Sequence, residues 1–405
     1  MLTRIAVAPS GFKESLSAES AAEAIATGVR RVVPDAEIDL IPLVDGGEGT
    51  AHALAVASGG RLVPLWATGP TGDRVGTHFA LLGDDESTAV VEMAAVAGLS
   101  LVPHDLRDPS ATTTYGVGEL IRAALDTGAR RILVGCGDSG TSDGGAGALQ
   151  ALGARLLDAD GRELPRGGGR LRSLDRIDTS GLDPRLWETE IRVACNPFNV
   201  LCGERGVARV FGPQKGATPA QVEHLASALE HWADVLTRDL GGRFDLRTDL
   251  YTGPGTGASG GLGAGLAALG AQLLPRFDVL LDHLDLDARL ARADLILTAE
   301  GALDHQTPRG KVPAEVARRA KRYGRPVLAL AGTLGDGAHQ VRAAGVDAYG
   351  SILPAPVSLT EALSRGGEFL TDATERAMRM VLIGTRLSAQ NEPVGSGTHR
   401  PSSVR

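Results

Sequence analysis

The sequence predicts an α/β protein of two domains, one discontinuous and the other inserted into it. A chain of 405 residues is too long for one ordinary core. Strand and helix patterns alternate at both ends, which favours a parallel sheet covered by helices. From about residue 60 the pattern changes to short alternating segments between glycine turns, typical of antiparallel hairpins. Because the two ends resemble each other and the middle does not, we assign residues 1–65 and 288–386 to one domain and residues 66–287 to the inserted domain.

The N-terminal elements follow a strand, helix, strand, helix order. Residues 4–10 form a short apolar run, and Ser17 is a suitable cap for a helix whose apolar positions recur at helical spacing until Pro34. A second strand is predicted at residues 37–43 and a second helix at residues 51–58. This order predicts the start of a parallel sheet.

The later elements repeat the alternation after the inserted domain. Residues 130–136 form a strand inside the inserted domain and run into a glycine-rich turn that opens a helix. The α/β pattern then returns with a strand at 291–300, a helix at 312–324, and strands at 325–332 and 347–352.

The composition excludes several classes of protein. The net charge of -8 and an aromatic share of 3% argue against a nucleic-acid partner, which needs a basic face and stacking platforms. The sequence contains no apolar run of about 18 residues, and Pro9 follows too early for a signal sequence. The three cysteines show neither zinc nor disulfide spacing and are expected to be reduced. We therefore expect a cytoplasmic protein that binds neither nucleic acid nor membrane. The polar segment 387–405 is predicted to be a disordered tail.

Five glycine-rich polar segments hold much of the excess of glycine, which numbers 54 residues. They stand at the ends of predicted strands, at residues 8–13, 45–50, 135–147, 253–265 and 298–311. In open α/β sheets these ends form the ligand crevice, where backbone N–H groups and helix dipoles attract anions. One such segment alone is more often a tight turn.

Three of the four lysines lie in glycine-flanked loop stretches, although arginine supplies nearly all other positive charge. They are Lys13, Lys215 and Lys311. Lysine is a compact charge suited to phosphate oxygens, one or two carboxylates hold Mg²⁺, and a further carboxylate orients an acceptor hydroxyl. Together these features predict phosphoryl transfer. The sequence has no G-x-x-x-x-G-K-[ST] motif and no dinucleotide fingerprint, which indicates a less common kinase fold.

Six motifs carry a resemblance to a known family. In chain order they are APSGFKESLSA, VDGGEGT, DGGAGALQALGA, VFGPQKGA, GASGGLGAGL and EGALDHQ…GKVP. Their order and spacing, from about residue 3 to 386, resemble the glycerate kinase family of bacterial glycerate metabolism. The resemblance implies a discontinuous Rossmann-like domain with an inserted mixed α/β domain, and an active site in the cleft between them. It also implies ATP and Mg²⁺ as partners and phosphorylation of D-glycerate, usually at C2, to 2-phosphoglycerate.

The resemblance implies the residues of the site by position. Those that match family motif residues are Lys13, Asp45, Glu48, Asp143, Lys215, Glu300, Asp304 and Lys311. We hypothesise that Lys13 faces the transferred phosphoryl group and that Glu300 or Asp304 orients the acceptor hydroxyl. Asp45 and Asp143 would hold Mg²⁺ directly or through water.

The nucleotide and acceptor sides complete the predicted site. Lys215 and Lys311 would neutralise the ATP phosphates. The remaining nucleotide-binding candidates are Gly137, Ser139, Thr141, Gly212, Gly255 and Gly257. The acceptor-binding candidates are Ser10, Glu48, Tyr115, Asn196 and His305. Four of these candidates have a structural alternative: Lys215 as a solvated turn residue, Lys311 as a cap on a neighbouring carbonyl, Tyr115 as a half-buried core residue, and His305 as a surface residue without a role in the site.

The departures from the family pattern cluster on the acceptor side. The family typically has Asp at Ser10, Arg at Tyr115, Asp at Asn196, Arg at Ala302 and Ser at His305. A substrate carboxylate is usually held by an arginine fork, which nothing isosteric replaces. Two alternatives therefore stay open: a kinase of the same family acting on a different hydroxylated metabolite, and a nucleotide-binding regulator without catalysis. A homodimer is compatible with either.

Overall fold

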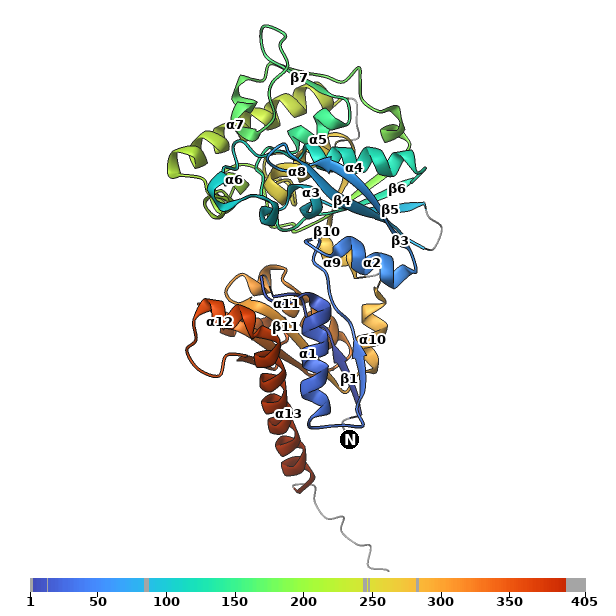
Figure 1. Cartoon of the computed structure of the whole chain (residues 1–405), viewed down its shortest axis with the longest axis vertical. Helices are drawn as coiled ribbons and strands as arrows, with labels where there is room; N and C mark the ends of the chain where they lie inside the picture. Colours follow the sequence, from blue (N-terminus) through green and yellow to red (C-terminus); the bar gives the residue numbers. More distant parts are fainter. Residues whose placement is uncertain are drawn as a thin grey trace, which may run out of the picture.

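The computed structural model describes residues 3–12, 14–83, 87–242, 246, 248–281 and 284–390. Two lobes follow one another along the long axis of the molecule (Figure 1). One lobe is built on a five-stranded sheet and the other on a six-stranded sheet. We call them the Rossmann-like domain and the inserted domain. The predicted α/β fold, with one discontinuous domain and one inserted domain, is confirmed.

The Rossmann-like domain has the strand order β13-β12-β11-β1-β2, and every neighbouring pair is parallel. Its strands are Arg4–Val7 (β1), Glu37–Leu40 (β2), Leu295–Leu303 (β11), Val327–Leu334 (β12) and Ala348–Ser351 (β13). Because side chains alternate along a strand, Ile5 and Val7 enter the core on one face of the sheet, and Ala6 enters the core on the other. The predicted strands of both chain ends therefore pair in one sheet.

Helices cover both faces of this sheet. One face carries α1 (Ala18–Arg30) and α13 (Gly366–Gln390), and the other carries α10 (Leu286–Arg292) and α11 (Val312–Arg322). The short helix α12 (Leu359–Ser364) precedes α13. The hydroxyl of Ser17 accepts a hydrogen bond from the amide of Ser20, as expected for the cap of α1. Helix α13 continues past residue 387, and residues 391–405 of the predicted tail lie outside the described residues.

The inserted domain contains a mixed sheet with the order β10-β9-β6-β5-β4-β3. Its strands are Arg61–Thr68 (β3), Arg74–Leu81 (β4), Thr88–Glu92 (β5), Arg131–Gly135 (β6), Glu190–Cys195 (β9) and Gln272–Pro275 (β10). Strands β3, β4 and β5 pair antiparallel, which confirms the hairpins predicted after residue 60, and the remaining pairs are parallel. Strand β3 pairs with β4 over its whole length, so the boundary placed at residue 65 falls inside β3. The boundary placed at residue 288 falls inside α10.

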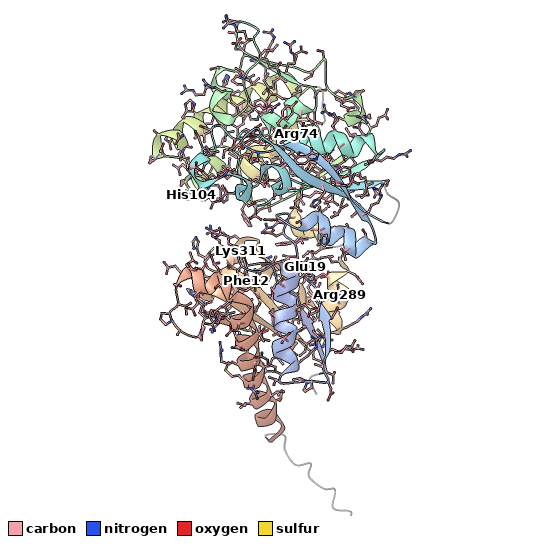
Figure 2. All side chains as sticks on the ribbon, viewed as in Figure 1. Phe12, Glu19, Arg74, His104, Arg289 and Lys311 are labelled. Atoms are coloured by element: carbon pink, nitrogen blue, oxygen red, sulfur yellow. The ribbon has the colours of Figure 1, made fainter. Side chains whose placement is uncertain are left out.

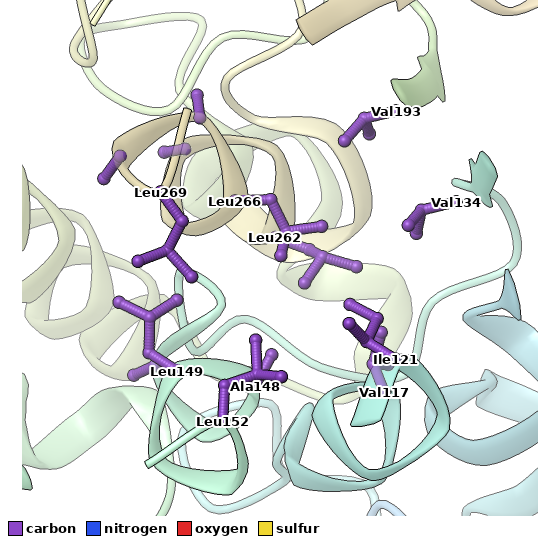
Figure 3. Packing of buried hydrophobic residues seen from close by; sticks show 14 of the residues in the cluster. Val117, Ile121, Val134, Ala148, Leu149, Leu152, Val193, Leu262, Leu266 and Leu269 are labelled. Atoms are coloured by element: carbon purple, nitrogen blue, oxygen red, sulfur yellow. The ribbon is translucent and has the colours of Figure 1, made fainter. Parts of the chain in front are cut away.

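The two faces of the mixed sheet are covered differently. The larger core lies under α4 (Tyr115–Asp126), α5 (Ala146–Ala151), α7 (Pro219–Leu240) and α8 (Ala258–Ala268). Figure 3 shows this packing, with leucines of α5 and α8 facing each other beside Val134 and Val193 of the strands. Helices α3 (Ala94–Ala97) and α6 (Val207–Phe211) and a small ribbon of β7 (Arg155–Leu157) and β8 (Arg176–Asp178) complete the domain.

The second face meets the domain junction. Helix α2 (Thr50–Ser58) and helix α9 (Arg276–Leu280) lie beneath the sheet at this point (Figure 1). Phe277 of α9 packs in the core of the Rossmann-like domain, while Leu280 packs with Leu54 of α2 under the mixed sheet. Helix α9 therefore contacts both domains. Every helix in the described part of the chain is too short or too polar to cross a membrane.

Candidate active site

Five charged side chains gather where the two domains join. We call Asp45, Arg276, Glu300, Asp304 and Lys311 the junction cluster. Lys311 pairs with Glu300 and Asp304, Arg276 pairs with Asp45, and the charges of Asp45 and Arg276 act on Glu300. Four of the five were predicted from sequence, and the fold brings these four together from two separate segments, one at Asp45 and one at residues 300–311.

Lys311 lies at the edge of the Rossmann-like domain that faces the inserted domain (Figure 2). Its Nζ is 3.3 Å from Asp304 Oδ2, 3.3 Å from the carbonyl oxygen of Ala302, and 3.5 Å from Glu300 Oε1. Glu300 and Ala302 belong to the carboxyl end of β11, and Lys311 immediately precedes α11. The cluster thus sits at the edge of a parallel sheet where ligands bind in such folds.

Glu300 and Asp304 differ in how their oxygens are used. Asp304 Oδ1 accepts hydrogen bonds from the amides of Gln306 and Thr307, and Oδ2 accepts one from Lys311. Glu300 Oε2 is buried and has no hydrogen-bond partner among the described residues. Because buried polar atoms usually have a hydrogen-bond partner, a bound ligand is a suitable donor for this oxygen.

The two carboxyl groups also differ in acidity. Burial raises the pKa of Glu300 to about 7, and the attraction of Lys311 only partly opposes it. Burial raises the pKa of Asp304 too, but the amide of Gln306 and the charge of Lys311 outweigh that effect and hold the pKa below its usual value. Glu300 is therefore the carboxyl group better suited to accept a proton near neutral pH.

Arg276 was missed by the sequence analysis. Its Nη1 donates to the carbonyl oxygen and to Oδ2 of Asp45, each at 3.0 Å, and its Nη2 donates to the carbonyl oxygen of Gly310 at 2.5 Å. It occurs in the stretch LLPRFDVL, which contains one carboxylate, Asp278, but no glycine and therefore lacks the glycine-rich loop pattern of the other candidates. Arg276 is one of 37 arginines, and nothing in its local sequence distinguishes it from the others.

Lys215 lies inside the inserted domain, away from solvent. It is 2% exposed, and its Nζ donates to Ser139 Oγ at 2.8 Å and to the carbonyl oxygen of Thr141 at 2.6 Å. Burial lowers the pKa of Lys215 to about 7, against the attraction of Asp143. The predicted trio of Lys215, Ser139 and Thr141 is thus one unit, but the ammonium supports the loop from within, and the solvated alternative for Lys215 is wrong.

The loop that Lys215 supports packs against the segment carrying Asp45. A Cβ atom on Gly137 would lie 2.6 Å from the Cα atom of Gly47, so only glycine permits this approach. The predicted nucleotide loop, residues 137–141, is therefore in direct contact with the segment at Asp45 and Gly47. We call this segment the first crossing, because here the chain passes from the Rossmann-like domain into the inserted domain.

Asp143 does not fit the metal-binding role predicted for it. It is fully buried, and its carboxylate accepts hydrogen bonds from the amides of Thr114, Gly145 and Gly147 and from the hydroxyls of Thr113 and Thr114. Burial raises the pKa of Asp143, and these donors oppose it. With both oxygens occupied by the protein, Asp143 joins the start of α4 to the turn before α5.

Glu92 performs a comparable role at the first crossing and was not predicted. Its Oε1 accepts from the amide of Gly49 and its Oε2 from the amide of Ala51, both at 3.0 Å, at the start of α2. Burial raises the pKa of Glu92 to about 7. An acidic residue at the end of the buried strand β5 was the available signal.

Four acceptor candidates lie on loops around the junction. Ser10 Oγ donates to the carbonyl oxygen of Ala299, the residue before Glu300. Asn196 Nδ2 donates across the junction to the carbonyl oxygen of Arg309 at 3.4 Å. Two others are exposed: the amide of Glu48 donates to Asp138 Oδ2, and the amide of His305 donates to the carbonyl oxygen of Asp336.

Tyr115 is not part of this group. The guanidinium of Arg166 stacks on its ring at 3.4 Å from the centroid, and the two side chains line an open pocket with Gln150 and Glu163. None of the other predicted site residues lines that pocket. The half-buried alternative for Tyr115 describes its surroundings better than a substrate contact does.

The remaining candidates have structural explanations or are outside the described residues. Gly255 has a φ of 84°, and a Cβ atom there would lie 2.4 Å from Cys195 Sγ. Cβ atoms on Gly212 and Gly257 would meet backbone carbonyl oxygens at 2.3 and 2.1 Å. Lys13 lies outside the described residues.

Comparisons with known proteins match nearly the whole chain. The model of the glycerate kinase family matches residues 5–382. The chain is 44% identical to a glycerate 2-kinase of Escherichia coli K12, covering 95% of this chain and 99% of the relative. It is 45% identical to a glycerate kinase of Bacillus subtilis 168, covering 95% and 98%.

A solved structure agrees with these relatives. A crystal structure of a candidate glycerate kinase 2 from Salmonella typhimurium LT2 superposes with a TM-score of 0.76 at 45% identity, covering 95% of this chain and 100% of that one. The match of the family model, the relatives and the fold leads to one conclusion: this chain belongs to the glycerate kinase family.

Proposed function

We propose that this chain is an ATP-dependent kinase that converts D-glycerate to 2-phosphoglycerate. Family membership supports the reaction class. The observation that carries the site is Glu300 Oε2, a buried carboxylate oxygen without a partner among the described residues, within an ion-paired cluster between two domains. Phosphoryl transfer needs such a preorganised charged site, from which water is excluded when the domains close.

Glu300 acts on the acceptor hydroxyl in this proposal. The hydroxyl donates a hydrogen bond to Glu300 Oε2, and its oxygen attacks the γ-phosphorus of ATP. As the new P–O bond forms, the bond from the γ-phosphorus to the bridging oxygen breaks, ADP leaves, and the hydroxyl proton passes to Glu300. Asp304 serves a different purpose, because its oxygens already hold the backbone and Lys311.

Lys311 stabilises the charge on the transferred group. In this structure its ammonium is balanced by Glu300 and Asp304 at 3.5 and 3.3 Å. An anionic triphosphate would compete for the same ammonium, which leaves Glu300 less engaged and free to orient the hydroxyl.

The junction cluster fits Mg²⁺ only as an ion that arrives with the nucleotide. Among the described residues no three His, Cys, Asp or Glu side chains form a metal-binding group. Mg²⁺ commonly uses one or two protein carboxylates together with substrate phosphates. In this proposal Asp45 would hold the ion, which would neutralise charge on the phosphates.

The nucleotide side of the proposal is the loop from Gly137 to Thr141. This loop contacts the Asp45 segment and follows the carboxyl end of β6, where backbone N–H groups suit phosphate oxygens. Lys215 holds the loop in shape from beneath, which replaces the direct phosphate contact first expected for it.

A different acceptor remains the second candidate because of Ala302. This residue is half-buried inside the junction cluster, and its carbonyl oxygen contacts Lys311. Its side chain offers no charge for a substrate carboxylate where the family typically has arginine. Tyr115 gives no such support, because its ring is stacked on Arg166 in another pocket.

A coupled ADP-release assay tests the proposal. The purified chain is given ATP and Mg²⁺ with D-glycerate, L-glycerate, other hydroxy acids and polyols, and the product is identified by ³¹P NMR. We expect D-glycerate to be the best acceptor and the phosphate to be on O2. Faster turnover of another acceptor would support a kinase with a different substrate. ATP binding without turnover of any acceptor would support a nucleotide-binding regulator without catalysis.

A further inference from the structure

The guanidinium group of Arg276 contacts two other segments of the domain junction. It is the first residue of α9, on the second crossing of the chain between the domains. Its Nη1 holds both the backbone and the carboxylate of Asp45 on the first crossing, and its Nη2 holds the carbonyl of Gly310, next to Lys311. One side chain therefore links both crossings to the loop of the junction lysine.

The burial of Arg276 makes these contacts specific. Its side chain is 13% exposed, and its Nε is buried without a hydrogen-bond partner among the described residues. Its hydrogen bonds are therefore made by the two outer nitrogens, while the guanidinium carbon lies 4.8 Å from the centroid of the Phe277 ring. Asn196 to Arg309, at 3.4 Å, is another polar contact across this part of the junction and is longer.

We propose that Arg276 is a positioning residue that sets the spacing of the two domains, so that Asp45 and Lys311 enter one site. The catalytic consequence rests on the proposed function, whereas the spacing does not. Phosphoryl transfer depends on placement, and a displacement of about 1 Å costs roughly 100-fold in rate. Loss of Arg276 would release Asp45 and the Gly310 loop together.

Arg289 provides a matched control. Like Arg276, it donates hydrogen bonds to one carboxylate, that of Asp39, through Nε at 3.0 Å and through Nη2. Its Nη2 donates in addition to the backbone carbonyl oxygen of Leu40 at 2.8 Å. Both partners lie in β2 or directly at its end, within the Rossmann-like domain. Arg289→Gln therefore removes a clamp of the same chemistry without touching the junction.

The experiment measures the distance between the domains in the full chain. Val56→Cys in α2 and Met380→Cys in α13 introduce two exposed labelling sites, one on each side of the junction. The three native cysteines are buried and compete poorly for label. Single-molecule energy transfer is then recorded for the parent, Arg276→Gln and Arg289→Gln, without ligand.

We expect Arg276→Gln to broaden or shift the distance distribution and Arg289→Gln to reproduce the parent. Turnover of Arg276→Gln should fall at least tenfold, beyond any fall in Arg289→Gln, with the KM for ATP changed less than threefold. Should Arg276→Gln fail to fold, Arg276→Lys, which can reach only one of the two partners at a time, should give an intermediate distribution.

An unchanged distance distribution in the Arg276 variant would overturn the proposal, as would a shift of equal size in the Arg289 variant. Because the distance is measured without turnover, a chain that phosphorylates none of the acceptors still tests the positioning role. Failure of the proposed kinase reaction and failure of this inference are therefore separate results.

Discussion

Glu300 and Asp304 share the ammonium of Lys311, at 3.5 and 3.3 Å, but only Glu300 keeps a buried oxygen without a partner among the described residues. The carboxylate of Asp304 accepts hydrogen bonds from two backbone amides and from Lys311. Two acidic residues four positions apart thus have different tasks, because one is on the strand β11 and the other opens the turn after it.

Glu300→Gln should lower kcat by about 10²- to 10⁴-fold, the usual contribution of a general base, with little loss of stability. Asp304→Asn should lower the melting temperature more, because it weakens the turn that carries Lys311. Steady-state kinetics and thermal unfolding of the two variants check this, with Glu188→Gln at an exposed position as control. Equal kcat values for Glu300→Gln and the control would refute the base assignment.

Lys311→Met should reduce kcat/KM for ATP by roughly 10- to 100-fold, since a hydrogen bond to a charged group is worth about 1.5–3 kcal/mol. It also leaves Glu300 and Asp304 without their shared counter-ion. Lys321→Met, which removes an exposed pair with Asp347 in the same domain, should keep parent kinetics. A parent-like KM for ATP together with a parent-like kcat in Lys311→Met contradicts the assignment.

Asp143→Asn should destabilise the chain by about 2–4 kcal/mol and leave the Mg²⁺ concentration for half-maximal rate unchanged. The reason is that the two carboxylate oxygens of Asp143 accept hydrogen bonds from three backbone N–H groups. The asparagine side chain has only one oxygen, so it cannot accept all of these hydrogen bonds. Asp45→Asn should do the reverse, raising the Mg²⁺ requirement with a smaller effect on stability. Urea unfolding and Mg²⁺ titration of activity separate the two. A raised Mg²⁺ requirement in Asp143→Asn would restore the metal role.

Lys215 should make stability rise with pH above neutrality. Its pKa is about 7 in the folded chain against 10.5 when unperturbed, so between these values the unfolded chain binds a proton that the folded chain does not. The free energy of unfolding therefore increases as pH rises through this window, by at most about 1.4 kcal/mol per pH unit from this group. Below pH 7 both states are protonated and the contribution no longer changes.

Denaturant unfolding at pH 7, 8 and 9 measures this slope. Lys215→Met should flatten it, whereas Lys321→Met, at a partly exposed lysine paired with Asp347, should keep the parent slope. If the Lys215 variant retains the parent slope, the buried amine is charged in the folded chain throughout.

The alternation of elements could be predicted because each signal is local. Ser17 caps α1 through a contact three residues away, and the apolar run from Ile5 to Val7 supplies both faces of a buried strand. The hairpins after residue 60 could also be predicted from residues that are close together in the sequence. The boundary at residue 65 fell inside β3 because the choice of sheet depends on β4, not on the composition of β3 itself.

The sequence predicted which residues belong to the site better than it predicted the role of each residue. Glycine and lysine in loops marked Lys311 and the segment of Asp45, and both reach the junction. Lys215 and Asp143 carry the same kind of signal, yet both are buried and hydrogen-bonded inside the inserted domain. Sequence spacing does not report whether a charged side chain faces a cleft or a protein interior.

The amino-acid sequence alone determined the two-domain α/β class, the family and most members of the junction cluster, because periodicity and motif order are properties of neighbouring residues. Only the tertiary structure decided that one oxygen of Glu300 has no partner within the described part of the chain, that both oxygens of Asp143 have partners, and that Arg276 joins the domains. The physical reason is that burial and hydrogen-bond saturation depend on groups that are distant in the chain and meet only when it has folded.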